Sequence, residues 1–477
     1  MLNLKPEVLW KYFEEISKIP RGSGNEEKVA EYVFKTAKNL GLKAKRDKVG
    51  NVLVEIPPSK ESENAPITVL QCHLDMVCEK NEGVQHDFKK DPIKLKVVGD
   101  YLMADGTSLG ADNGIGVATC LALMEEKDYK RGSLELLFTV DEETGLNGAF
   151  GLSSTFLKGR QLINLDSEEE GIIYIGCAGG KDTVLKLKTK RKENFNFDKF
   201  FKVSIKGLKG GHSGVDIHEG RACANLLISR FLKEFLKENE FELVSINGGS
   251  KRNAIPREAF AVLGANEEVL KNFAEKQEKI FLSEYKKIDP DLNILIEKVE
   301  PEFKPMEKKF KEKIINFLIT IPHGVLKMSF DVKGLVETST NFAIIETRER
   351  EIEIATSQRS SLSSGINWAS DIIKSLGKIV KAKVEQSKGY PGWKPDPSSP
   401  LLKKVSKTFE NFFGKEPQLK AIHAGLECGI IGEHYPGMDM VSIGPQIENV
   451  HSPSERVHIK SVERFYNFLK EVLKDLA

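Results

Sequence analysis

The sequence has little of what marks secreted or nucleic-acid-binding proteins. It contains only 6 cysteines in 477 residues, and none of them forms a C-x-x-C pair. This usage excludes a disulfide-rich scaffold and a zinc module with paired cysteine ligands, and it favours buried, reduced thiols. Lys and Arg number 71 and Asp and Glu number 70. Net charge therefore gives no reason to expect a nucleic acid or an acidic membrane as partner.

Long hydrophobic runs are absent as well. No stretch of about 18 apolar residues is available to span a bilayer. The first residues lead into charged amphipathic sequence without the apolar core of a signal peptide. We therefore expect a cytoplasmic protein with no membrane partner.

What the sequence does contain is the alternation of an α/β protein. Apolar runs typical of buried strands lie at 51–56, 67–72, 134–140 and 161–165, and residues 114–125 have helical spacing. This order predicts a domain with a mixed, largely parallel sheet flanked by helices. A chain of this length is expected to form two domains or three.

The pattern changes near residue 186. An alternating strand at 201–205, a glycine-rich loop at 207–214 and a strong helix at 220–236 predict an inserted α+β domain. A stiff connector at 389–395 leads back to helices and a strand. We predict residues 1–186 and 387–477 as two parts of one discontinuous domain and residues 187–386 as the insertion.

Two local patterns concern residues outside the predicted site. Ser23 and Glu26 have the spacing of a capping box for the second helix. Glu168 to Glu170 form an acidic run that we interpret as a solvated face.

Four short polar runs follow or abut predicted strands: Cys72-His73-Leu74-Asp75, Gly110-Ala111-Asp112-Asn113-Gly114, Val140-Asp141-Glu142-Glu143 and Asn449-Val450-His451-Ser452. Together they supply two imidazoles and several carboxylates. This mixture suits a pair of divalent metal ions with a spare acid to move protons. Because functional groups gather at the carboxyl ends of parallel strands, we expect these side chains to converge.

Each run offers a particular chemical role. His73 and Asp75 stand two residues apart at a strand end, so one can bind a metal ion while the other orients it from behind. Asp112, which lies between glycines before a helix, is either a carboxylate that bridges two cations or a helix cap.

The acids after the strand at 134–140 are the most informative run. Three consecutive carboxylates at a sheet end repel one another unless a metal ion or a proton relieves them. We assign Glu143 to a metal ion and Glu142 to the general base. Asp166 fits a terminal ligand, and His451 fits a ligand that closes the site from a polar loop.

Three further residues are candidates on weaker patterns. His212 lies in the glycine-rich loop of the insertion, where it either donates to a developing oxyanion or is simply exposed. His423 and Gly425 belong to a candidate substrate loop at 421–429, which also contains Glu427.

The order of these motifs resembles that of the aminoacyl-histidine dipeptidases, also called Xaa-His dipeptidases or peptidase D. The resemblance rests on H-x-D, G-A-D-N-G, D-E-E, a strand followed by Asp, G-G-H-S-G and a late His. The runs at 71–77 and 211–217 are similar to this branch in particular. The branch belongs to the two-zinc peptidases, which include carnosinases, aminoacylases and glutamate carboxypeptidase.

The resemblance implies a role for each site residue. It implies one zinc ion held by His73 and Asp166, another held by Glu143 and His451, Asp112 as the bridge, Asp75 behind His73, and Glu142 as the base. It also implies a cis peptide bond after Asp112, and substrate contacts from Asn253 and Arg359. The insertion resembles a lid and dimerisation domain, so a homodimer is expected. Whether His212 serves its own subunit or a partner's site stays open.

The predicted function is a metal-dependent dipeptidase that hydrolyses Xaa-His and other dipeptides. A water activated between two metal ions attacks the peptide bond, with Glu142 as general base. Zinc is the expected metal, with manganese or cobalt as alternatives. One rival is an N-acyl amino acid amidohydrolase with the same two-metal site. Another is a metal-binding or assembly protein with a dead site, against which the intact Glu142 argues.

Overall fold

The computed structural model describes residues 2–477, which divide into two compact units. The first unit runs to Cys177 and is completed by Trp393–Ala421 and Leu426–Ala477. The second unit comprises Ala178–Gly392 and Ile422–Gly425. Within the described residues, none of the helices combines the length and the apolar character needed to cross a membrane.

The main sheet of the first unit has the strand order β1-β2-β6-β3-β7-β21-β8-β20. The four central strands, β6, β3, β7 and β21, pair in parallel, whereas β1, β2 and β8 join the sheet through antiparallel pairs. The mixed, largely parallel sheet flanked by helices is therefore confirmed. The strands are β1 (Lys43–Arg46), β2 (Val52–Ile56), β3 (Thr68–His73), β6 (Leu134–Thr139), β7 (Gln161–Asn164), β8 (Ile172–Cys177), β20 (Gln418–Ile422) and β21 (Asp439–Ser442).

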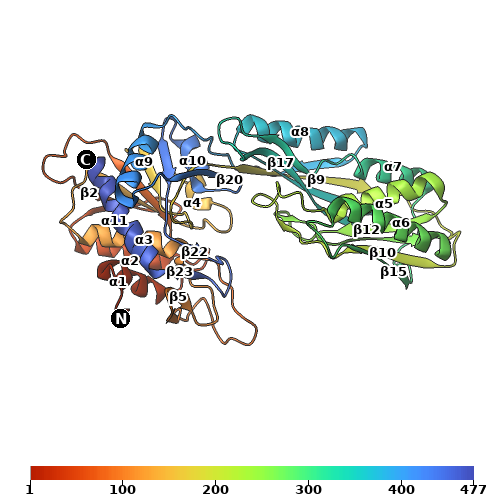
Figure 1. Cartoon of the computed structure of the whole chain (residues 1–477), viewed down its shortest axis with the longest axis horizontal. Coiled ribbons are helices and arrows are strands. Elements are labelled where there is room, and N and C mark those ends of the chain that lie inside the picture. Colours follow the sequence, from red (N-terminus) through yellow and green to blue (C-terminus); the bar gives the residue numbers. More distant parts are fainter. Residues whose placement is uncertain (1) are drawn as a thin grey trace. The chain divides into compact units, whose positions relative to one another are not determined.

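Helices cover this sheet. Every residue of β3 and β6 is buried, which explains why both runs are mainly apolar and do not alternate between apolar and polar residues. Helix α3 packs against β3, and α9 packs against β21. Helix α3 also packs against α1, and α9 against α11 (Figure 1). The helices are α1 (Glu7–Ser17), α2 (Glu27–Asn39), α3 (Ala111–Glu125), α4 (Asn147–Phe150), α9 (Pro400–Phe413), α10 (Glu427–His434) and α11 (Ile459–Asp475).

A small second sheet of the first unit has the order β22-β23-β5-β4. Its strands are β4 (Leu95–Val98), β5 (Tyr101–Ala104), β22 (Ile447–Glu448) and β23 (Arg456–His458). Strand β23 pairs antiparallel with β5, so the start of β23 lies beside the end of β5. This pairing joins the loop at 449–455 to the segment that precedes α3.

The second unit contains a nine-stranded sheet with the order β15-β10-β14-β12-β17-β18-β9-β19, and β16 pairs with β17 off this path. Helices pack on this sheet. The strands are β9 (Gly179–Lys188), β10 (Phe200–Lys206), β11 (Gly211–His212), β12 (Glu242–Gly248), β13 (Ala254–Ile255), β14 (Ala259–Gly264), β15 (Asn293–Val299), β16 (Gly324–Met328), β17 (Val336–Thr347), β18 (Glu351–Ser360) and β19 (Lys383–Gln386), and the helices are α5 (Ala224–Glu238), α6 (Glu267–Tyr285), α7 (Lys308–Leu318) and α8 (Ser363–Ile379). The boundaries that we predicted at residues 186 and 386 fall within β9 and at the end of β19.

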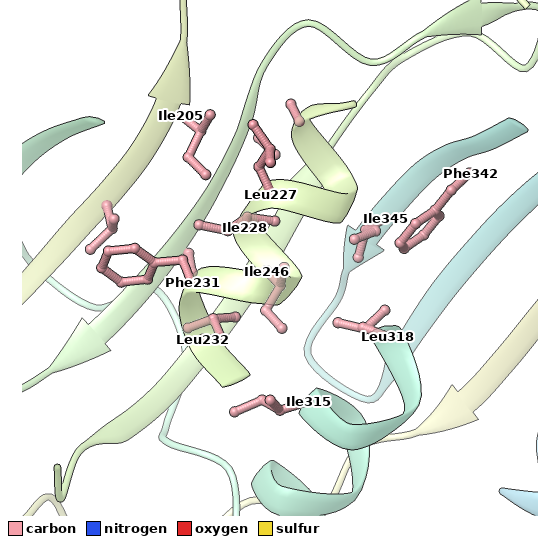
Figure 2. Close-up of a cluster of buried hydrophobic side chains, with 14 of the residues drawn as sticks. Ile205, Leu227, Ile228, Phe231, Leu232, Ile246, Ile315, Leu318, Phe342 and Ile345 are labelled. Carbon is pink, nitrogen blue, oxygen red and sulfur yellow. The ribbon is translucent and has the colours of Figure 1, made fainter. Parts of the chain in front are cut away.

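Helix α5 forms the centre of this core. Figure 2 shows its side chains Leu227, Ile228, Phe231 and Leu232 between strands and the end of α7. Their spacing of three and four residues places them on one face of the helix. Burying each such side chain contributes about 1.5–3 kcal/mol, so this face holds the helix on the sheet.

Two local predictions require correction. The capping box is wrong, because the Ser23 hydroxyl donates to Asp75 Oδ2 (2.8 Å) and Glu26, the N-cap of α2, accepts from the Gly24 amide. Ser23, at the start of a helix, thus makes a tertiary contact in place of the local one.

The prediction of buried thiols holds for five of the six cysteines. All six are free, but Cys78 is exposed while the other five are buried.

Candidate metal centre

The predicted metal ligands lie at one edge of the main sheet. His73 ends β3, and β3 pairs in parallel with β6 on one side and β7 on the other. Glu143 therefore follows β6, and Asp166 follows β7, at the same edge as His73. Asp112 at the start of α3 and His451 after β22 join them from other elements.

These side chains form two groups that share one carboxylate. His73 Nε2 lies 3.1 Å from Asp112 Oδ1 and 3.2 Å from Asp166 Oδ1. His451 Nε2 lies 3.1 Å from Asp112 Oδ2 and 3.1 Å from Glu143 Oε2. Each oxygen of Asp112 thus faces a different group, which is the arrangement expected of a bridging ligand.

The charges of the two groups show that a cation fits. The buried Oε1 of Glu143 has no hydrogen-bond partner within the described residues. Burial, together with the Asp112 and Glu143 carboxylates, raises the pKa of Asp166 to about 6. Imidazole nitrogens and carboxylate oxygens are ligands for zinc and similar divalent ions, which supply the positive charge that such a cluster needs. The residues present therefore fit divalent metal ions.

The turn before α3 brings Asp112 into both groups. Gly110 has a φ of 70°, a left-handed conformation that glycine adopts without strain from a Cβ atom. The Asp112–Asn113 peptide bond is cis, as the resemblance implied. Asn113 Nδ2 donates to the Leu165 carbonyl oxygen (2.9 Å), next to Asp166. The turn is thus tied to the end of β7.

Asp75 lies behind His73 and also holds the loop after β6. Its Oδ1 lies 3.3 Å from His73 Nδ1 and accepts from the Glu142 amide (3.0 Å), while Oδ2 accepts from the Glu143 amide (3.1 Å). Burial opposes ionisation, but the His73 contact and the bonds from Glu142 and Ser23 outweigh it and lower the pKa of Asp75 to about 2. One ionised carboxylate therefore orients an imidazole and two neighbouring acids.

Glu142 lies beside the first group. One ligand atom each of His73, Glu142 and Glu143 falls within 4.8 Å of the others. Burial and the neighbouring carboxylates of Asp166, Glu427 and Glu143 raise the pKa of Glu142. A carboxyl group with this environment is suited to accept and return a proton.

Three of the candidate residues, His212, Arg359 and His423, lie near one another in the second unit. His212 Nδ1 accepts from the amides of Gly214 (3.2 Å) and Val215 (3.1 Å), so its proton resides on Nε2. Burial and the Arg359 guanidinium lower the pKa of His212 to about 4. The same two causes lower the pKa of His423 to about 3. Both imidazoles are therefore neutral at pH 7.

Arg359 and Gly425 meet at one tyrosine. Arg359 Nη1 donates to Tyr390 Oη (3.1 Å), and Gly425 packs against the Tyr390 ring where a Cβ atom would clash. His423 Nε2 lies 2.7 Å from Ser339 Oγ. Asn253 has an exposed side chain, and its carbonyl oxygen accepts from the Ser213 amide (2.8 Å).

The acidic run after Asp166 is not the solvated face that we predicted. Glu170 forms two 2.6 Å bonds with Arg464, and Glu169 pairs with Lys420. Burial and the Asp112 and Asp166 carboxylates raise the pKa of Glu168 to about 8. The prediction failed because the cationic partners lie far along the chain.

Sequence reasoning also missed two buried charges. Arg21 and Glu455 are each 2% exposed and contact the turn that carries Asp112. A single charge outside any motif carries no periodic signal, so only its tertiary contacts reveal it.

The chain is similar to known peptidases along most of its length. Residues 69–475 match the model of the peptidase family M20/M25/M40. The cytosol non-specific dipeptidase of Escherichia coli (strain K12) is 43% identical over 476 residues, which cover 99% of this chain and 98% of that protein.

The chain is also similar to solved structures of peptidases. Aminoacylhistidine dipeptidase from Vibrio alginolyticus is 41% identical with a TM-score of 0.91, over 99% of this chain and 97% of that one. The aminopeptidase PepT from Bacillus cereus ATCC 10987 is 16% identical with a TM-score of 0.59, over 99% of each chain, and so shares the fold alone. The resemblance to aminoacyl-histidine dipeptidases is confirmed. Because the family match spans most of the sequence and a 43% identical relative aligns along nearly its whole length, the chain belongs to the peptidase family M20/M25/M40.

Proposed function

We propose that this peptidase is a metal-dependent dipeptidase that holds two divalent cations per subunit. The observation that carries the proposal is the shared Asp112, whose two oxygens face two separate groups of ligands. His73 and Asp166 would hold one ion, and Glu143 and His451 the other. Zinc suits this mixture of nitrogen and oxygen donors, and manganese or cobalt suits it as well.

Glu142 supplies the proton transfer. When bound, the two cations polarise the peptide carbonyl and lower the pKa of water. Glu142 accepts a proton from the attacking water, whose oxygen forms the new bond to the carbonyl carbon. As the carbon–nitrogen bond breaks, Glu142 passes that proton to the leaving amine. Asp75 keeps the Glu142 backbone and the His73 ring in place for these steps.

The second unit contributes the groups that hold the substrate. His212 presents Nε2–H, a donor suited to the developing oxyanion, since its Nδ1 is occupied by two amides. Arg359 carries the positive charge that a dipeptide carboxylate requires, and its buried Nε has no hydrogen-bond partner within the described residues. Asn253, His423 and Gly425 complete this set.

The second unit also serves as lid and as the dimerisation domain of a homodimer. Within residues 2–477, β16 pairs with β17 and with no other strand, and it carries Met328, which is 42% exposed. Phe330 is 90% exposed and Trp368 on α8 is 49% exposed. Exposed apolar side chains of this size, on an edge strand, just after it and on α8, fit a second copy of the chain. Light scattering after size-exclusion chromatography tests this proposal, which expects the mass of a dimer and is contradicted by the mass of a single chain.

The cellular location follows from the relatives. The Escherichia coli relative is named for the cytosol, and we extend that location to this chain.

The substrate class is tested with a panel of compounds. Metal-stripped chain is reloaded with zinc or manganese and assayed on Xaa-His dipeptides, other dipeptides, longer peptides and N-acetyl amino acids. The proposal expects hydrolysis of dipeptides with a free amino terminus. Preference for N-acetyl amino acids would instead identify an amidohydrolase, and absence of turnover with metal bound would identify a binding protein.

A further inference from the structure

One buried carboxylate accepts hydrogen bonds from four consecutive amides. Glu455 Oε2 accepts from Leu109 (2.8 Å) and Gly110 (2.9 Å). Its Oε1 accepts from Ala111 (2.7 Å) and Asp112 (3.3 Å). The side chain is 2% exposed, so these bonds replace water around the whole carboxylate.

The energetics of this contact exceed those of an ordinary helix cap. A buried carboxylate is costly unless it is fully hydrogen-bonded, and hydrogen bonds to a charged group are stronger than those between neutral groups. Two of the amides, those of Ala111 and Asp112, belong to α3, whose backbone is not helical at Asp112 and Asn113. The four bonds to Glu455 therefore restrain the backbone of the turn that carries Asp112.

The same carboxylate belongs to the loop that carries His451. The Glu455 amide donates to the Ser452 carbonyl oxygen (3.1 Å), and Ser452 Oγ donates to the Asn449 carbonyl oxygen (2.7 Å). Directly after Glu455, β23 begins and pairs with β5 (Figure 1). Glu455 is thus the side chain that ties the His451 loop to the Asp112 turn.

Arg21 holds the other side of that turn. Its Nη2 donates to the Gly110 carbonyl oxygen (2.5 Å), and its Nη1 donates to the carbonyl oxygens of Leu74 (3.0 Å) and Asp75 (2.9 Å). The turn therefore lies between a carboxylate and a guanidinium. Arg21 links it to the end of β3, and Glu455 links it to the late loop.

We propose that Glu455 is a positioning residue that fixes the distance between His451 and Asp112 and thereby determines the affinity of one cation site. This inference rests on the proposed two-metal function and adds a positioning residue to one of the two cation sites. The site affected is the group of Asp112, Glu143 and His451. The other group, His73, Asp112 and Asp166, shares Asp112 with it. Arg21 and Asn113 still attach the Asp112 turn to the ends of β3 and β7 in the variant, so the affinity of this other group is expected to change little.

Glu455→Gln tests the inference, because an amide cannot accept from all four N–H groups. Glu135 provides a matched control: it is also 2% exposed and accepts from the amides of Lys158 and Gly159, but it lies near the amino end of β6, away from the ligands. Both variants of the full chain are stripped of metal and titrated with Mn²⁺ by calorimetry. Their thermal unfolding and dipeptide turnover are recorded alongside.

The parent chain and Glu135→Gln are expected to bind two ions alike. In Glu455→Gln one ion is expected to bind as in the parent and the other about 10–100-fold more weakly, the usual effect of losing a partner behind a ligand. Excess Mn²⁺ should then restore part of the lost turnover. Both variants are expected to unfold at lower temperature than the parent.

Two results would overturn the inference. Glu455→Gln could bind two ions with parent affinity, or both variants could lose metal equally, which would make the role merely structural. Should Glu455→Gln fail to fold, Glu455→Asp keeps the charge but is one methylene too short to reach both amide pairs, and parent affinity at both sites in that variant overturns the inference. A parent chain that binds fewer than two ions overturns the two-metal function itself, and this inference with it.

Discussion

Replacing Asp75 by Asn should damage the metal centre although Asp75 is not a proposed ligand. The carboxylate contacts His73 and accepts from the amides of Glu142 and Glu143 and from the Ser23 hydroxyl. An Asn side chain retains one acceptor oxygen and places an NH₂ group against donors that it cannot satisfy. The His73 ring and the loop after β6 would both lose their fixed positions.

The magnitude follows from the pKa of Asp75. Its folded pKa of about 2 lies below the ordinary value of 3.8, which corresponds to about 2 kcal/mol of stability. Because the folded pKa is depressed, this stabilisation is complete above pH 4 and is lost as the pH falls toward 2. At pH 7 the variant should lose it in full, and metal affinity should fall about 10–100-fold.

The assay compares three proteins at pH 7. Parent, Asp75→Asn and Ser23→Ala are stripped of metal, titrated with Mn²⁺ by calorimetry, unfolded by denaturant and assayed on one dipeptide. Ser23→Ala removes one donor and keeps the charge, so its metal affinity should remain that of the parent. Unchanged metal affinity and turnover in Asp75→Asn would refute the reasoning.

Three further predictions concern the base, pH and metal. Glu142→Gln should keep its metal content and lose turnover by about 10²–10⁴-fold; metal analysis with a turnover assay checks this, and near-parent activity would show that another group is the base. Burial lowers the pKa of His323 to about 4, so stability should fall as the pH drops from 6.5 to 4, by up to about 1.4 kcal/mol per pH unit; His323→Asn should flatten that slope in denaturant unfolding, and an unchanged slope would place the effect elsewhere. Adding zinc at 100 times the Kd of a site should stabilise the stripped chain by about 2.7 kcal/mol for each ion bound. An unfolding temperature that does not change with zinc would contradict binding to the folded state.

The parts of the fold that follow from local pattern were predictable. The runs at 67–72 and 134–140 became β3 and β6, because strands buried on both faces need continuous apolar sequence. His73 and Asp166 could be predicted to lie close together because the carboxyl ends of parallel strands meet at one edge of the sheet. Hydrophobic pattern and sheet topology together thus predicted which side chains meet at the strand ends.

What depended on distant partners was not predictable. Ser23 donates to Asp75 and not to the start of α2, and Glu170 pairs with Arg464 almost three hundred residues away in sequence. Glu455 contacts the Asp112 turn through four amides that no motif announces. The residues alone left open whether Asp112 is a bridge or a helix cap, and it is the tertiary structure that shows both imidazoles facing its carboxylate.

The central claim is that Asp112 joins two cation sites that act together on dipeptides. The most direct measurement titrates metal-stripped chain with zinc while bound zinc per chain and hydrolysis of one Xaa-His dipeptide are followed in the same samples. We expect activity to reach its maximum as the second ion binds. Full activity with one ion or none, or no hydrolysis with two ions bound, would contradict the claim.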